Sequence, residues 1–380
     1  MHLGTQVEAQ PDQTALAVIA HHGVRRVLVR LVVLDPGFEA GVGIYLDDVY
    51  LNRPQGAVLD VFDVERIEVL RGPQGTLFGK NASAGVVSIV TKRPSATPTG
   101  FVEGSYFEGN EIRVRGGVSG PLSDTVRGGL TAVYGKYDGN TKNVFNGEDV
   151  NGYERFGVRA KVEWTPSDNL TVTGIADWVN AVDNASADII GFVTPGNAIL
   201  GQLGTVKAAD GNRQISNDYA PVTKDSNFGV SGQVDYQMGD YTLTSISAWR
   251  GWGNTEQRDG DFTAYLGRNV GTSSSRDFGI LDFTQMSQEV RLASPTGQFL
   301  EYVVGGYYYH TDQDNFFNRL NVTCTATTLA AARPPLPGHA LPLHDQRAGE
   351  HLLRGLLQHR RRLAGQHRLV ELQRLGACER

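Results

Sequence analysis

The sequence has little of what marks several large protein classes. Its 380 residues include only two cysteines, Cys324 and Cys378, which lie far apart and form no CxxC pair. This count indicates neither a zinc site nor a disulfide-stabilised scaffold. No run of apolar residues approaches the roughly 18 that a membrane-spanning helix needs. The apolar segment 15–20 has acidic residues before it and arginines after it, which makes it a poor secretory signal.

Nucleotide-binding motifs are also absent. The glycine-rich stretch 70–94 contains a Gly79-Lys80 pair, but only three residues separate Gly75 from it, whereas a P-loop needs four. Lys80 is followed by Asn81, which has no hydroxyl to bind magnesium. We therefore expect no phosphate site here.

Enzyme chemistry and nucleic-acid binding find little support. The formal net charge of −6 argues against a general nucleic-acid partner. The nine histidines show no HExxH spacing, and no nucleophile, base and orienting residue occur together as a set. We predict a protein that is not an enzyme, with no catalytic residues and no resident metal or cofactor.

Alternation with period two dominates residues 101–317 and predicts about nine strands. In the segment 155–164, one parity carries apolar residues from Phe156 to Trp164, and the other carries Arg159, Lys161 and Glu163. The segment 165–169 has turn chemistry and predicts a hairpin with a five-residue turn.

Two arrangements fit these strands. A soluble β-sandwich also alternates, but the strands run roughly 10–12 residues, close to the length that crosses a bilayer at a tilt. Aromatic residues gather near the strand ends, as interfacial bands would require; they are Trp164, Trp178, Trp249, Trp252 and the segment 307–309. A membrane barrel is favoured and a soluble all-β fold stays open.

The ends of this region have other compositions. Residues 41–94 are glycine-dense, with short strands expected over 42–49 and 63–70, and form a small α/β-like unit that is too polar for a barrel wall. After Phe317 there is no Phe, Tyr or Trp, and five histidines and many arginines appear. The tail is interpreted as a GC-rich gene translated in the wrong frame, with a basic amphipathic helix over 351–375 as the alternative.

Three segments carry a family resemblance. They read GIYLDDV at 43–49, VERIEVLRGPQGTLFG at 64–79 and NASAGVVSIVTKRP at 81–94, and SQEVRLAS at 287–294 accompanies them. These segments resemble the plug domain and a barrel strand of TonB-dependent outer-membrane receptors, over about residues 35–317. The resemblance implies a mainly β fold, a plugged transmembrane β-barrel of twenty-two strands, here incomplete and with a partial α/β plug.

The resemblance also implies a function. Such receptors import scarce nutrients, commonly ferric siderophores and also cobalamin, haem or sugars, using energy delivered by TonB and its inner-membrane complex. We expect uptake of a ferric siderophore, with outer-membrane lipid and the small-molecule ligand as further partners and no nucleic acid. The expected location is the outer membrane of a Gram-negative bacterium, although neither a signal peptide nor a TonB box is recognisable.

Site residues follow from the matching motifs. The plug motif comprises Asp47, Asp48, Arg71, Gly72, Pro73, Gly79, Asn81 and Gly85. Arg71 resembles a position that pairs with barrel carboxylates, so we predict a contact with Glu289, beside Arg291 on the inward face; an arginine satisfied inside the plug is the alternative. Asp47 and Asp48 are expected on a strand, pointing to opposite faces. Tyr219, Phe262 and Tyr265 are candidate ligand contacts, against the alternative that they are ordinary exposed aromatics.

The chain is expected to divide into four parts. They are an atypical N-terminus at 1–34, mis-called or out of frame; a partial plug at 35–98; the first part of a barrel at 99–322; and a basic, frameshifted tail at 323–380. Nine strands would leave unpaired edges, so we expect the chain to be inactive by itself. The alternative function is a soluble β-rich binding protein with a basic C-terminal tail.

Overall fold

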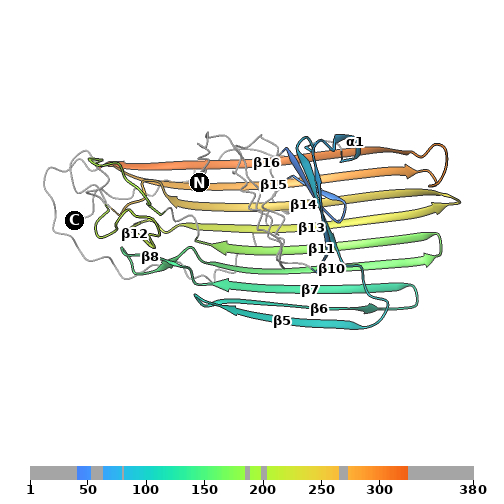
Figure 1. The fold of residues 1–380 in the computed structure, drawn as a ribbon, viewed down its shortest axis with the longest axis horizontal. Helices are drawn as coiled ribbons and strands as arrows, with labels where there is room; N and C mark the ends of the chain where they lie inside the picture. Colours follow the sequence, from blue (N-terminus) through green and yellow to red (C-terminus); the bar gives the residue numbers. More distant parts are fainter. Residues whose placement is uncertain are drawn as a thin grey trace, which may run out of the picture.

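The computed structural model describes residues 41–52, 63–78, 81–184, 189–197, 203–264 and 273–323. A small four-stranded sheet lies across one face of a large nine-stranded sheet, near the end where the large sheet has its short turns (Figure 1). No helix in the described part of the chain is long and apolar enough to cross a bilayer. The predicted segment 1–34 and, apart from Thr323, the predicted tail lie outside the described residues.

The small sheet has the strand order β2-β1-β4-β3. Its elements are β1 (Val42–Leu46), β2 (Val49–Leu51), β3 (Val64–Arg71), the single-turn helix α1 (Gly75–Phe78) and β4 (Gly85–Thr91). Strand β1 runs parallel to β4, whereas β2 pairs with β1 and β3 pairs with β4 in antiparallel fashion. A mixed sheet with one helical turn agrees with the predicted α/β-like unit.

The predicted strand over 42–49 is in fact two strands and a turn. Asp47 and Asp48 have φ values of 46° and 64° and connect β1 to β2. Positive φ at both central residues is the geometry of the tight hairpin turns that match strand twist, and Asp tolerates it better than most residues. The two carboxylates are therefore presented at the tip of a hairpin and not along a strand.

The large sheet is an antiparallel meander with the order β16-β15-β14-β13-β11-β10-β7-β6-β5. Its strands are β5 (Thr99–Phe107), β6 (Glu111–Pro121), β7 (Val126–Tyr137), β10 (Tyr153–Ser167), β11 (Leu170–Asp183), β13 (Val222–Met238), β14 (Tyr241–Asp259), β15 (Ser273–Ala293) and β16 (Val303–Thr323). Strands β8 (Thr141–Asn143), β9 (Asp149–Val150) and β12 (Gln214–Ile215) form a third sheet in the long connections. The nine predicted strands are confirmed.

Strand β10 shows how the sequence distributes its side chains. Phe156, Val162 and Trp164 are exposed, whereas Arg159 and Glu163 are buried. Apolar residues thus face outward and charged residues face the small sheet, the reverse of a soluble sheet with one solvated face. The predicted five-residue turn was wrong, because β10 extends to Ser167 and only two residues precede β11, with a register shift after Trp164.

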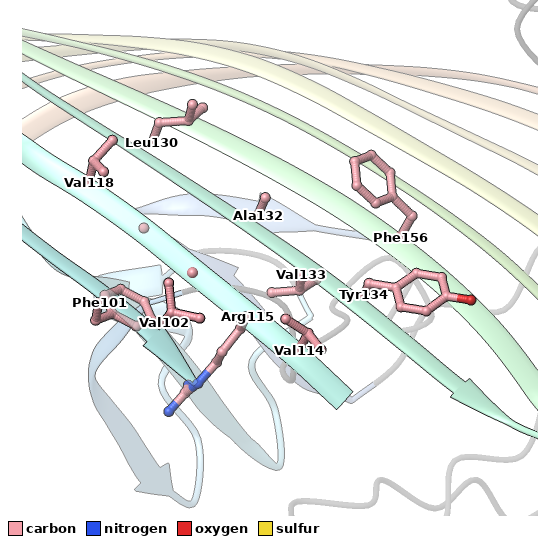
Figure 2. A pocket seen from close by; sticks show the side chains of 12 residues that line it. Phe101, Val102, Val114, Arg115, Val118, Leu130, Ala132, Val133, Tyr134 and Phe156 are labelled. Atoms are coloured by element: carbon pink, nitrogen blue, oxygen red, sulfur yellow. The ribbon is translucent and has the colours of Figure 1, made fainter. Parts of the chain in front are cut away.

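The outward face is apolar over the first strands of the large sheet. Figure 2 shows a shallow hollow where Val118 and Leu130 project from the side opposite to Arg115. The hollow forms because Gly116 and Ala132 have little or no side chain between larger neighbours. Val102, Val118 and Leu130 are all exposed there, so this face meets an apolar medium more favourably than water.

Three aromatic residues expected in the outward bands lie on the inward face instead: Trp252, Tyr307 and Tyr309, of which the last two stack with ring centroids 6.2 Å apart. Trp252 is buried, and its indole Nε1 donates a hydrogen bond to Asp225 Oδ1 at 2.8 Å. The ring of Tyr309 packs on that of Tyr50 in the small sheet, with centroids 5.8 Å apart. Parity along the strand decides this, because all three fall on the face that meets the small sheet.

Apolar contacts seat the small sheet on the large one. Ile44 and Leu46 of β1 share a buried cluster with Val179 of β11. Val49 of β2 forms a second cluster with Ile246 and Ala248 of β14. The two sheets therefore share cores, and the hairpin β1–β2 is held over β11 and β14 in a fixed place.

Candidate functional site

The site begins at the hairpin tip. Asp47 is held by its own sheet, since its N–H donates to Ile89 O at 2.9 Å. Its carboxylate accepts from Thr91 twice, from N–H at 2.9 Å and from Oγ1 at 2.8 Å. These bonds lie within the small sheet, so they orient the carboxylate independently of the large sheet.

Five charged side chains meet here; we call them the charge cluster. They are Asp47, Arg159, Lys161, Asp177 and Arg250. Arg159 bridges the sheets, binding Asp47 Oδ2 through Nη2 and Asp177 Oδ1 through Nη1, the latter at 2.5 Å. Lys161 Nζ lies 3.2 Å from Asp47 Oδ1 and donates to Thr91 O at 3.1 Å. Every side chain of the charge cluster is between 3% and 14% exposed, so these ion pairs are shielded from solvent.

Arg250 of β14 completes the charge cluster; in the large sheet, β13 lies between β14 and the strand β11 that carries Asp177. Its two terminal nitrogens bind the Asp177 carboxylate at 3.2 Å and 3.0 Å. The guanidinium reaches Asp177 by crossing Gly229, where a Cβ would collide with Arg250 Nη1. A residue larger than glycine at position 229 would displace this arginine.

The charges do not balance. Three cations face two carboxylates, which leaves one net positive charge in a buried place. Burial of the Asp47 carboxyl raises its pKa, but the charges of Arg159 and Lys161 and the hydrogen bonds from Thr91 outweigh burial and lower the pKa below its usual value. Asp47 therefore stays ionised through the whole neutral and mildly acidic range.

This shift predicts an acid limb of stability. A carboxyl whose pKa is lower in the folded protein stabilises it above the unfolded pKa and loses that contribution as the pH falls through the folded pKa. We expect the free energy of unfolding of the full chain in detergent micelles to fall between pH 5 and pH 3, and Asp47→Asn to make this fall shallower. Urea titrations at pH 7, 5 and 3 measure it; an equal fall in both proteins would contradict the assignment.

A second charged contact holds the segment that follows β4 and leads to the large sheet. Glu163 of β10 is 1% exposed and accepts from Arg93 Nε at 2.9 Å and from Arg127 Nη2. Arg93 follows β4, and Arg127 lies on β7. The segment that joins the two sheets is thus tied to the inward face where it leaves.

Uncharged hydrogen bonds connect β2 of the small sheet to β15 of the large sheet. Gln285 of β15 donates from Nε2 to Tyr50 O at 2.5 Å and accepts from the N–H of Asn52 at 3.3 Å. Backbone groups of Tyr50 in β2 and of Asn52, just after β2, are thereby paired with a side chain from the large sheet, as buried polar groups require.

The predicted pairing of Arg71 is not formed. Arg71 ends β3 with an exposed side chain, and Glu289 pairs with Arg291 of its own strand at 3.2 Å. Among the described residues, no ion pair joins Arg71 to Glu289. Arg291 does contact the small sheet, because its Nη2 lies 3.6 Å from Asp48 Oδ2. Pro73 lies exposed between β3 and α1.

The other motif residues shape the small sheet. Gly72 and Asn81 have φ values of 82° and 63°, and Asn81 donates to the hydroxyl of Tyr50 at 2.6 Å. Gly85 lies opposite Arg71, where a Cβ would fall 2.6 Å from Leu70 O. Gly79 lies outside the described residues. These positions serve turns and close backbone approach.

The candidate ligand contacts have local partners. Tyr219 lies under the guanidinium of Arg276, 5.3 Å from its ring centroid, and burial raises the pKa of Tyr219 while Arg276 opposes the rise. Phe262 has a φ of 61° and donates its N–H to Asp259 Oδ1 at 2.9 Å, as a turn residue does. Tyr265 lies outside the described residues. A ligand role for these three stays a prediction.

Asp177, Arg250 and Gln285 were not singled out from the sequence. The usable signal was their parity, because each falls on the face that carries Arg159, Lys161 and Glu289. Among the described residues, no group of three or more His, Cys, Asp and Glu side chains is placed to hold a metal ion.

Comparison with known proteins agrees with this geometry. Residues 26–86 match the family model described as TonB-dependent Receptor Plug Domain. The pesticin receptor of Yersinia pestis is 30% identical over 218 residues, which are 56% of this chain and 30% of that protein. The ferric enterobactin receptor PirA of Pseudomonas aeruginosa is 25% identical over 238 residues, 60% of this chain and 31% of that protein. The chain thus spans about a third of the length of these relatives.

Solved structures share the fold. The ferric yersiniabactin uptake receptor FyuA from Yersinia pestis superposes with a TM-score of 0.60 at 24% identity, covering 74% of this chain and 41% of that chain. The ferripyoverdine receptor of Pseudomonas aeruginosa gives a TM-score of 0.57 at 19% identity, covering 74% and 37%. The small sheet therefore lies in a region that matches the plug domain of TonB-dependent receptors, and the two sheets together share the fold of these solved receptors.

Proposed function

We propose that this chain is part of a TonB-dependent outer-membrane receptor that takes up a ferric siderophore. The observation that carries the proposal is the charge cluster, which anchors a matched plug domain to the inward face of the wall through Asp47. A domain seated on that face through buried charges is suited to closing a lumen. The relatives named for pesticin, ferric enterobactin and ferrioxamine B support a receptor rather than an enzyme.

The outward face supports a membrane location. Val230, Met286 and Val290 are exposed on the side away from the plug, together with Val118 and Leu130. A soluble protein rarely exposes so continuous an apolar surface, whereas a barrel wall turns it to lipid. We place the receptor in the outer membrane of a Gram-negative bacterium, with TonB as the partner that would deliver energy.

Ligand binding tests this proposal. The full chain, refolded in detergent micelles, is titrated with ferric enterobactin, ferrioxamine B and ferric yersiniabactin, each against its iron-free form. Nine strands are not expected to carry a ligand across a membrane, so the readout is binding and not transport. We expect saturable binding of at least one ferric complex and weaker binding of the iron-free form. Absence of binding by all three would overturn the ferric siderophore assignment.

Fractionation separates the alternative function. A soluble β-rich binding protein would be released from cells by lysis without detergent. The wall's apolar outward face leads us to expect that the chain stays with the outer-membrane fraction until detergent is added. Recovery in the soluble fraction as a folded monomer would favour the alternative.

A further inference from the structure

We propose that Arg159 and Lys161, supported by Arg250, form an anion-binding site on the inward face of the wall. In the plugged state Asp47 fills this site, and a carboxylate group of a ligand takes its place when Asp47 withdraws. The site itself follows from the charge cluster; its use by cargo rests on the function proposed above.

The contacts of Asp47 define the site's chemistry. One carboxylate oxygen meets the Arg159 guanidinium, and the other lies 3.2 Å from Lys161 Nζ. A guanidinium and an ammonium on separate oxygens suit a planar, singly charged carboxylate. Both cations belong to β10, two residues apart on one face, so they remain with the wall when the plug hairpin moves.

Arg250 keeps the site positive. Without it, Asp177 would neutralise Arg159, to which it is bound at 2.5 Å. Arg250 binds both oxygens of Asp177 and offsets that carboxylate. Withdrawing Asp47 would leave three cations against the one carboxylate of Asp177, a net charge of plus two. A buried surplus of this kind strongly favours a replacement anion, because uncompensated buried charge is costly.

Acetate reports the site directly. Asp47→Gly removes a side chain equivalent to acetate and suits the backbone, since φ is 46° at this position. We expect acetate to raise the melting temperature of this variant by several degrees, and saturably, relative to chloride at equal ionic strength. Acetamide, which has the same shape without the charge, is expected to have no such effect.

Two variants sharpen the result. Asp48→Gly removes the neighbouring carboxylate, which is nearly half exposed and lies 3.6 Å from Arg291, and its response to acetate should equal that of the unsubstituted chain. Lys161→Gln, added to Asp47→Gly, should abolish the acetate response. If Asp47→Gly does not refold in chloride, its refolding yields in acetate and in acetamide are compared instead, and we expect the higher yield in acetate.

The proposal is overturned if acetate and acetamide act alike on Asp47→Gly, or if Asp48→Gly responds as strongly. No iron or siderophore enters this experiment. A missing acetate response with intact ferric siderophore binding would therefore reject the anion site alone. An acetate response without siderophore binding would keep the anion site and reject the uptake function.

Discussion

Replacing Asp177 with asparagine is expected to lower the free energy of unfolding by about 3–5 kcal/mol, as for other buried ion pairs that lose one partner. Asp177 binds both Arg159 and Arg250 and is 3% exposed as a side chain. The amide keeps the shape of the carboxylate but leaves three buried cations with Asp47 as their one counter-ion. Urea unfolding of the full chain in detergent micelles, at pH 7, measures the loss.

A control variant separates lost charge from lost hydrogen bonds. Asp235 accepts hydrogen bonds from the neutral groups of Thr244 and Gln233, at 2.7 Å and 2.8 Å. Asp235→Asn is expected to cost about 1 kcal/mol, the net value of an ordinary hydrogen bond. Adding Arg250→Gln to Asp177→Asn removes one surplus cation, so the pair should cost less than the sum of the single changes. Equal losses for Asp177→Asn and Asp235→Asn would contradict the role assigned to the charge cluster.

Much of the fold was predictable because its rules are local. Alternation along a strand needs only neighbouring residues, and it placed Phe156 and Trp164 opposite to Arg159 and Glu163, as the structure has them. Turn details were less accessible. The Asp47–Asp48 turn was expected as strand, since the apolar residues on both sides of it hide a two-residue reversal whose one mark in the sequence is the pair of aspartates.

The site was harder to predict because its contacts cross the chain. Asp47 meets Arg159 and Lys161 across 112 and 114 residues, and no sequence pattern specifies which inward residues a hairpin tip will face. Arg71 illustrates the same limit, since its expected partner Glu289 is bound by Arg291 two residues away on its own strand. Parity identified the correct face, whereas the packing of the plug decided the partners.

Replacing Gly85 with alanine is the second change with a large expected effect. Gly85 begins β4 opposite Arg71, with a φ of 155°, and a Cβ there would lie 2.6 Å from the carbonyl oxygen of Leu70. That oxygen belongs to the backbone of β3, so no side-chain rotation can relieve the contact. We expect a loss of about 3 kcal/mol or more in the free energy of unfolding, from strained backbone and overpacking together. The following residue, Val86, is fully buried, so the plug core would shift with the strand.

Alanine substitutions at three glycines of the plug distinguish backbone strain from a backbone clash as the source of the lost stability. Gly75 begins α1 with open space around it, so Gly75→Ala should be neutral or slightly stabilising, as alanine is in a helix. Gly72 has a φ of 82° but equally open space, and Gly72→Ala should cost about 1 kcal/mol from backbone strain alone. Gly85 combines an unfavourable φ with a backbone clash, so its loss should be the largest. If Gly85→Ala cost no more than Gly72→Ala, β3 and β4 would have to separate readily. The plug would then be held by its contacts with the wall rather than by its own sheet.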